Sequence, residues 1–112
     1  MGNVEPRNTI IMSLLKNLFK PKERVDFRTL MANGAIIIDV RTKGEFEMGH
    51  VKKSNNIPLD KIPSKIDKIK KLNKPVILCC ASGMRSAKAT RVLKNNGIEA
   101  YNGGSWRNLQ FS

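Results

Sequence analysis

The chain has 112 residues, of which 40% are hydrophobic and 27% charged, and its formal net charge is +12. This length suits one domain that buries its own core, and the composition is that of a folded protein. The positive charge favours anionic partners. Because the basic residues are spread along the chain without interleaved aromatic side chains, nucleic acid is not the expected partner.

Residues 1–24 differ from the rest and predict an amphipathic N-terminal extension, because apolar side chains recur there at helical spacing. The apolar run is too short to cross a bilayer and Lys16 interrupts it, so no membrane-spanning helix is expected and a membrane is the less expected partner. The extension could pack on the domain, serve as an accessory leader or attach to a membrane surface, and Met12 could be the natural start. Its apolar positions are Ile10, Ile11, Leu14, Leu15, Leu18 and Phe19.

Residues 25–112 alternate between short apolar runs and helical segments, a pattern typical of crossover units around a parallel sheet. In chain order, we expect a helix capped by Asp26 and ended by Gly34, a strand from Ala35 to Val40, a short helix with a capping box of Thr42 and Glu45, and a brief strand from Asn55 to Pro58. There follow a helix with an apolar stripe at Ile62, Ile66 and Ile69, a strand from Val76 to Cys80, a helix ended by Gly97, a strand from Glu99 to Tyr101 and a final turn capped by Ser105.

These elements predict an α/β fold with an open, mainly parallel sheet of about five strands and helices on both faces. In such sheets the ligand site lies beyond the carboxyl ends of the strands. Cys80 and the pair Asp39 and Arg41 both fall at strand ends, so we expect them to share one edge of the sheet. Since buried charges need partners, we expect Asp39 and Arg41, with Ser86, to orient a loop there rather than to touch substrate.

The cysteines point to a nucleophile. Cys79 and Cys80 are adjacent, and a disulfide between neighbours would be strained, so we expect free thiols in a reducing, cytoplasmic compartment. The single histidine, His50, gives no familiar zinc spacing with them, and no metal or cofactor is expected. Cys80 precedes a helix, where backbone N–H groups can lower a thiol pKa from about 8.5 to between about 3.5 and 7.5.

The residues after Cys80 are suited to holding an anion. Ala81, Ser82 and Gly83 are small enough for successive N–H groups to point inward, and Arg85 adds a fixed positive charge beyond Met84. We expect residues 81–85 to bind the substrate. Simpler structural roles are expected for three other side chains: Cys79 as a small core residue, His50 in a hydrogen bond and Trp106 as a lid on the core.

Six segments of the chain, in order and at similar spacing, resemble the rhodanese domain over about residues 25–110. After the segment that corresponds to Gly49-His50-Val51, members of that family commonly continue with Pro-Gly-Ala. This chain instead has Lys52-Lys53-Ser54 there, in a connecting turn. The six segments are Asp39-Val40-Arg41, Glu45-Phe46, Gly49-His50-Val51, Asn56-Ile57-Pro58, Cys80-Ala81-Ser82-Gly83-Met84-Arg85-Ser86 and Gly103-Gly104-Ser105-Trp106.

The resemblance implies a sulfurtransferase in which Cys80 takes a sulfane sulfur from a small anionic donor such as thiosulfate. The resulting persulfide would pass its sulfur to cyanide, to a thiol or to a protein acceptor. A non-catalytic binding or regulatory module is the alternative, because one fold can host either. A phosphatase or arsenate reductase is the lesser alternative. In those relatives the loop is one residue longer than the four residues between Cys80 and Arg85.

Overall fold

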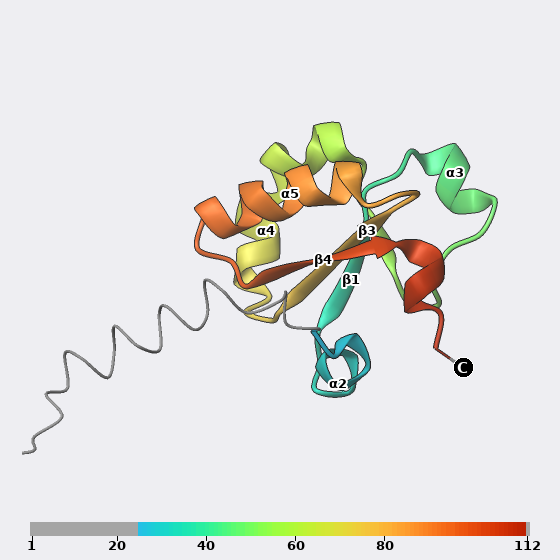
Figure 1. Ribbon diagram of the computed structural model, residues 1–112. Coiled ribbons are helices and arrows are strands. Elements are labelled where there is room, and N and C mark those ends of the chain that lie inside the picture. The colour runs from blue at the N-terminus through green and yellow to red at the C-terminus, as the bar shows by residue number, and fades with distance from the viewer. Residues whose placement is uncertain (1–24, 112) are drawn as a thin grey trace, which may run out of the picture.

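Four parallel strands form the centre of the molecule, in the order β2-β1-β3-β4 (Figure 1). The computed structural model describes residues 25–111, so the extension expected at 1–24 lies outside the described residues. The strands are β1 (Ile36–Asp39), β2 (Asn55–Asn56), β3 (Val76–Cys80) and β4 (Ala100–Ser105). The helices are α2 (Phe27–Ala32), α3 (Lys43–Glu47), α4 (Ile62–Lys71) and α5 (Met84–Asn95), with 3-10 turns η1 (Leu59–Lys61) and η2 (Trp106–Leu109).

The α/β class, the parallel sheet and the helices on both faces are confirmed, with four strands in residues 25–111 instead of about five. Two strand lengths also differ from expectation. β2 ends before Pro58, whose nitrogen has no hydrogen to donate to a neighbouring strand. β4 continues past Tyr101 through Gly103 and Gly104, since a bulge lets these glycines stay in the sheet.

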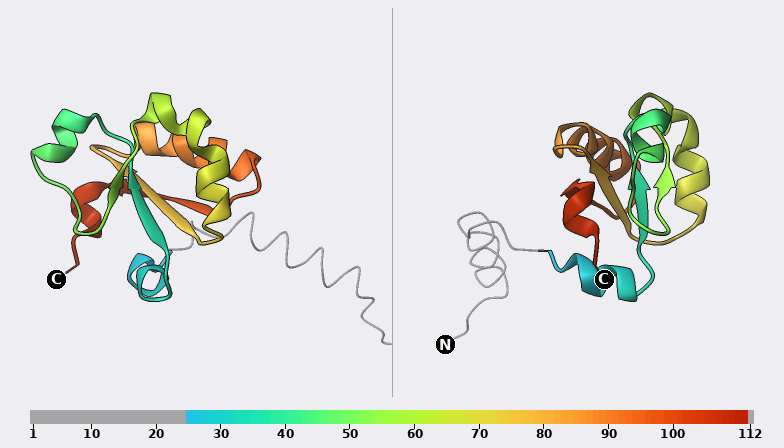
Figure 2. Two further views of the ribbon diagram at one scale, coloured as in Figure 1. Left: turned by 180° about the vertical axis from the view of Figure 1, so that it is seen from behind. Right: turned by 90° about the vertical axis from the view of Figure 1, so that its right-hand side faces the viewer.

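Each face of the sheet buries a separate apolar cluster. Figure 2 shows the helices that lie on either side of the sheet. On one face, Ile38, Leu78 and Cys80 pack against α4 and α5. On the other face, Ile37 and Cys79 pack against α2 and η2. β3 is buried along its whole length, which explains its continuous apolar sequence.

Capping residues fix where α2 and α3 begin, as the sequence predicted. Asp26 accepts a hydrogen bond from the Thr29 N–H at the start of α2. Thr42 and Glu45 form the reciprocal capping box of α3. Gly34 has φ +101°, which lets the chain turn from α2 into β1.

The order of the strands reverses between β1 and β3. From β1 the chain crosses to β2 on one side, and from β2 it returns to β3 on the other side of β1. Asp39, the last residue of β1, pairs with Cys79, so Asp39 and Cys80 end neighbouring strands at the same edge. Such a reversal point is where open parallel sheets bind ligands. None of the helices between residues 25 and 111 combines the length and apolar character that crossing a bilayer requires.

Candidate active site

The sulfur of Cys80 lies under the loop that joins β3 to α5. Its Sγ accepts a hydrogen bond from the Gly83 N–H at 3.0 Å and a longer one from the Ser86 N–H at 3.5 Å. Gly83 has φ +102°, and a Cβ there would come within 3.2 Å of the Gly104 Cα. Only glycine therefore allows this loop to fold back over the sulfur and still touch β4.

These hydrogen bonds favour the anionic form of Cys80. Burial on its own would raise the pKa of the thiol. The backbone N–H groups of Ser86, Gly83 and Ser82, and the Ser86 hydroxyl when its hydrogen is directed at the sulfur, act in the opposite direction and hold the pKa below its ordinary value. The structure therefore contains the main-chain cradle that the sequence indicated, although its occupant is the sulfur of Cys80 itself.

The thiol is also less accessible than the sequence suggested. Cys80 is 0% exposed, whereas we expected it at an open edge of the sheet. Met84, the first residue of α5, is 75% exposed. A reagent can reach Sγ only when the Cys80 side chain or residues 81–85 move outward.

Arg85 points to α3 rather than to the sulfur. Its Nη1 and Nη2 donate to the two carboxylate oxygens of Glu45, at 2.7 and 2.9 Å. The contact with Arg85, followed by hydrogen bonds from Thr42, lowers the pKa of Glu45 to about 2. The substrate-binding role expected for Arg85 stays a prediction, because both terminal nitrogens already bind a carboxylate.

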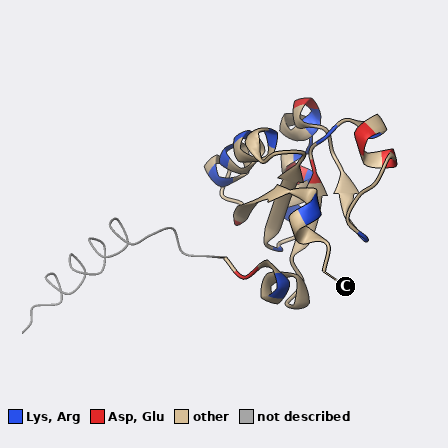
Figure 3. Ribbon diagram, turned by 45° about the vertical axis from the view of Figure 1, so that its right-hand side comes forward, with Lys and Arg blue, Asp and Glu red and all other residues tan. Residues whose placement is uncertain are grey.

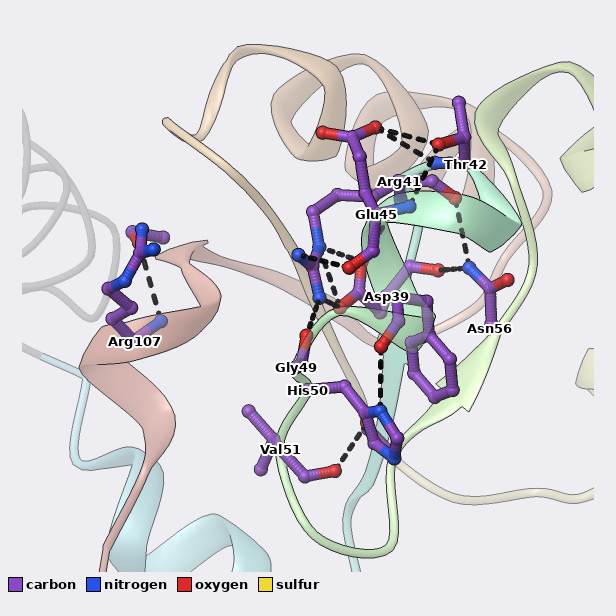
Figure 4. A network of polar contacts seen from close by, with 12 residues as sticks. Asp39, Arg41, Thr42, Glu45, Gly49, His50, Val51, Asn56 and Arg107 are labelled. Atoms are coloured by element: carbon purple, nitrogen blue, oxygen red, sulfur yellow. Dashed lines mark hydrogen bonds and ion pairs between the residues drawn. The ribbon is translucent and has the colours of Figure 1, made fainter.

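Asp39 and Arg41 form a buried ion pair beside the site (Figure 4). Arg41 Nε and Nη2 donate to the Asp39 carboxylate at 2.9 and 2.6 Å, and Nη2 also donates to the Gly49 carbonyl at 2.7 Å. The Arg41 guanidinium lies 4.6 Å from the centroid of the Trp106 ring. This pair therefore holds the segment around α3 in place through hydrogen bonds to its carbonyl groups. Residues 81–85 are held instead by Glu45 and Asn102.

Cys79 faces the opposite side of the sheet from Cys80. It is 0% exposed and packs in the cluster beneath α2 and η2. Burial raises the pKa of its thiol to about 12, and the nearby Asp39 carboxylate adds to this effect. The structure agrees with the small core residue that strand alternation predicted.

His50 is occupied by a structural contact. Its ring stacks on Phe46, with centroids 3.7 Å apart, and its Nδ1 lies 2.8 Å from the Phe46 carbonyl oxygen. Because a carbonyl oxygen only accepts, Nδ1 is the donor. This arrangement agrees with the hydrogen-bonding role expected for His50.

Asn102 joins the loop to β4, a role that no pattern in the sequence indicated. Its Nδ2 donates to the Gly83 carbonyl at 3.1 Å, while its Oδ1 accepts from the Ser86 hydroxyl at 2.6 Å. The register between β3 and β4 shifts just after Asn102, because Gly103 is the extra residue of a bulge. The bulge lies beside the Cys80 loop, a common use of bulges near functional sites.

The charges around the site are unevenly distributed. Figure 3 shows Lys and Arg along the helices and red acidic segments on several elements, among them α3 with Glu45 and Glu47. The carboxylate on α3 that reaches the loop is Glu45, which is paired with Arg85. The resulting neutral pair leaves the loop N–H groups as the donors nearest to Sγ.

Comparisons with known proteins agree with this geometry. The profile of the Rhodanese-like domain family matches residues 23–107. The chain belongs to the rhodanese-like domain family. An uncharacterized Bacillus subtilis protein, YqhL, is 37% identical over 90 residues, which are 80% of this chain and 67% of that protein.

Three other proteins match with identities between 26% and 34%. A rhodanese-like domain protein of Staphylococcus aureus superposes with a TM-score of 0.61 at 31% identity, covering 88% of this chain and 85% of that one. A human single-domain sulfurtransferase superposes with a TM-score of 0.59 at 26% identity, and the match covers 75% of this chain and 88% of that one. A tRNA sulfurtransferase of Thermoplasma acidophilum is 34% identical over 60% of this rhodanese-like chain, which spans only 13% of that protein. Sulfur transfer is thus supported at the level of the family.

The structure brings together most of the residues that the sequence singled out. Cys80, the loop 81–85 and Ser86 form one site, and Asp39 ends the adjacent strand, two residues before Arg41. Glu45 was recognised as a capping residue and as part of the family resemblance, but its pairing with Arg85, 40 positions away, leaves no local signal. Asn102 was missed because an isolated Asn before two glycines is a common turn signal.

Proposed function

We propose that this rhodanese-like domain is a sulfurtransferase in which Cys80 carries the sulfur as a persulfide. The observation that carries the proposal is the set of main-chain N–H groups directed at the Cys80 sulfur at the start of α5. A thiolate must attack the donor, and the outer sulfur of a persulfide is also anionic. The same donors suit both species, because they are already oriented before charge develops.

The reaction balances in two steps. The Cys80 thiolate attacks the outer sulfur of thiosulfate, the sulfur–sulfur bond of thiosulfate breaks, and sulfite leaves with the bonding electron pair. Cyanide or a thiolate then attacks the outer sulfur of the Cys80 persulfide. Thiocyanate or a new persulfide leaves, and the Cys80 thiolate is restored.

We assign the remaining residues by their contacts. Ala81, Ser82, Gly83 and Met84 belong to the loop over Cys80 and are assigned to surround the transferred sulfur, and Arg85 holds this loop through Glu45. The donor is a small sulfur anion and the acceptor a small thiol, cyanide or a protein thiol. A reducing, cytoplasmic setting suits the free Cys79 and Cys80.

The mass of the intact protein after incubation with thiosulfate tests the proposal. We expect a gain of one sulfur atom, removed again by cyanide with release of thiocyanate. Cys80→Ser should abolish the gain and Cys79→Ser should retain it, since Cys79 lies on the other face of β3. Sulfur uptake by the Cys80 variant at the normal rate would contradict the assignment.

A second candidate is a non-catalytic binding module, and one observation favours it. The Cys80 thiol is fully buried, and both terminal nitrogens of Arg85 bind Glu45. An unchanged mass after incubation with thiosulfate, in protein whose Cys80 can be alkylated, would favour this candidate. Phosphate turnover without sulfur transfer would instead favour the phosphatase or arsenate reductase alternative.

A further inference from the structure

The amide of Asn102 has one fixed orientation, because a backbone group holds each end. Its Nδ2 donates to the carbonyl of Gly83 at 3.1 Å, and its Oδ1 accepts from the N–H of Gly104 at 3.0 Å. A carbonyl oxygen only accepts and a backbone N–H only donates, so turning the amide over would break both hydrogen bonds. The acceptor Oδ1 is therefore the atom that faces Ser86.

This orientation decides where the Ser86 hydroxyl points. Ser86 Oγ lies 2.6 Å from Asn102 Oδ1 and 3.4 Å from Cys80 Sγ. A hydroxyl group has a single hydrogen, and Asn102 Oδ1 can only accept it. Ser86 is therefore left to face Cys80 with a lone pair, which suits a protonated thiol as donor and opposes a thiolate.

An anionic sulfur requires the opposite arrangement. The Ser86 hydroxyl can stabilise a Cys80 thiolate only by turning its hydrogen away from Asn102. We propose that Asn102 is a positioning residue that holds the Ser86 hydroxyl in the direction suited to the protonated thiol, and that this hydroxyl turns to Cys80 when the sulfur becomes anionic. Asn102 thus competes with Cys80 for one hydrogen and restrains formation of the nucleophile.

This inference deepens the proposed function, in which the thiolate starts the reaction, but its test does not require sulfur transfer. The charged groups on the neighbouring elements are Arg85, paired with Glu45, and the Asp39–Arg41 pair at the end of β1. Cys79 remains a neutral thiol at neutral pH, because burial raises its pKa to about 12. Replacing Asn102 changes the charge of none of these groups.

Asn102 also ties the Cys80 loop to β4, and this second role predicts an effect of opposite sign. If the residue served only to hold Gly83 in place, its loss would loosen the Gly83 N–H that donates to Sγ. The thiolate would then lose a donor and the pKa of Cys80 would rise. Competition for the Ser86 hydrogen predicts instead that the pKa falls.

The test is a pH titration of the Cys80 thiolate by its ultraviolet absorbance, with the Cys80→Ser protein as the baseline. This absorbance does not require a reagent to reach the buried sulfur. The proteins to compare are wild type, Asn102→Ala, Ser86→Ala and the double variant, with Asn95→Ala on the exposed surface of α5 as a matched control. Alkylation rates against pH, with the modified peptide identified by mass, provide a second readout.

We expect Asn102→Ala to lower the pKa of Cys80 by roughly half a unit to one unit, since one hydrogen bond is redirected. Ser86→Ala should raise this pKa. The double variant should have the same pKa as the Ser86→Ala variant, because Asn102 then has no hydroxyl to hold. Asn95→Ala should leave it unchanged.

Any other response of the Asn102 variant overturns the inference. A rise or no change in the pKa would show that Asn102 only holds the loop, and an equal fall with and without the Ser86 hydroxyl would show that this hydroxyl is not involved. The proposed function fails separately, through absence of sulfur uptake by wild type. The expected titrations in a protein that takes up no sulfur would support the inference and remove the proposed function.

Discussion

Glu45 and Arg85 clamp the start of α5 to α3 through two parallel hydrogen bonds of 2.7 and 2.9 Å. The same Glu45 carboxylate closes the capping box of α3 by accepting from the Thr42 N–H. One side chain therefore fixes the start of one helix and the loop next to Cys80. Both side chains are 37% exposed, so solvent screens much of their attraction.

Replacing Glu45 by Gln should lower the free energy of unfolding by about 1 kcal/mol or less, because a partly exposed ion pair contributes no more than that. The pKa of Glu45 is lowered from 4.5 to about 2, so the folded state favours the charged form. Its contribution is complete above about pH 4.5 and is lost as the pH falls through about 2. Urea unfolding of both proteins across this range measures the difference.

Glu47→Gln is the matched control for Glu45→Gln, because Glu47 lies on the same helix and forms only a 3.9 Å exposed pair with Lys43. It should change the free energy of unfolding less than Glu45→Gln does. If the difference in unfolding free energy between wild type and Glu45→Gln stayed constant down to pH 2, the Glu45 charge would not stabilise the fold.

Local patterns were sufficient to predict the elements that surround the site. The capping box of Thr42 and Glu45 depends on residues three positions apart, and the buried strand at Val76–Cys80 depends on a continuous apolar run. Both were found correctly because each signal lies within a few residues. The length of β4 was underestimated, since two consecutive glycines normally indicate a turn rather than a bulged strand.

Contacts between distant segments could not be predicted in the same way. Ser86 and Asn102 meet only because β3 and β4 are neighbours and Gly103 inserts a bulge beside them. The direction of the Arg85 side chain likewise depends on where α3 packs. Sequence spacing located the cradle around Cys80, whereas the burial of its sulfur follows from the exact path of residues 81–85.

Only one of the two adjacent thiols should react with iodoacetamide in the folded protein near neutral pH. Hydrogen bonds hold the pKa of Cys80 below its ordinary value, whereas burial raises that of Cys79 to about 12. The thiolate is the reactive form, so Cys79 should be silent. Mass spectrometry of the alkylated peptide should locate the label on Cys80, and both residues should react in urea. Labelling of Cys79 in the folded protein would contradict its placement.

Cys79 should make the protein less stable in alkali. Its pKa is raised from 9.0 to about 12 on folding, so the stability that it contributes is complete below pH 9.0 and is lost between 9.0 and about 12. The loss should approach about 1.4 kcal/mol per pH unit within that range. Cys79→Ala should flatten the dependence of unfolding free energy on pH there, although its loss of packing lowers stability at every pH.

The comparison between wild type and Cys79→Ala cancels the other groups that titrate in alkali. Cys80→Ala serves as the matched control, because the pKa of Cys80 is lowered on folding and therefore changes the free energy of unfolding with pH in the opposite direction. Stability from Cys80 is present above pH 9.0 and is lost as the pH falls through its folded pKa. Equal alkaline slopes in wild type and Cys79→Ala would show that the Cys79 thiol ionises as easily as an exposed one.

Replacing Gly103 or Gly44 by Ala should change the free energy of unfolding in opposite directions. A Cβ on Gly103 would lie 2.9 Å from Ile77 Cγ2 and 2.9 Å from Leu109 Cδ1, so Gly103→Ala should cost about 1–3 kcal/mol of unfolding free energy. A Cβ on Gly44, within α3, would meet nothing within 4 Å, and Gly44→Ala should stabilise by up to about 1 kcal/mol. Because Gly103 forms the bulge next to Asn102, its replacement should also shift the pH at which Cys80 ionises, whereas Gly44→Ala should not. Thermal unfolding and the thiolate titration measure the two effects, and a Gly103→Ala protein with wild-type values in both would contradict the packing around the bulge.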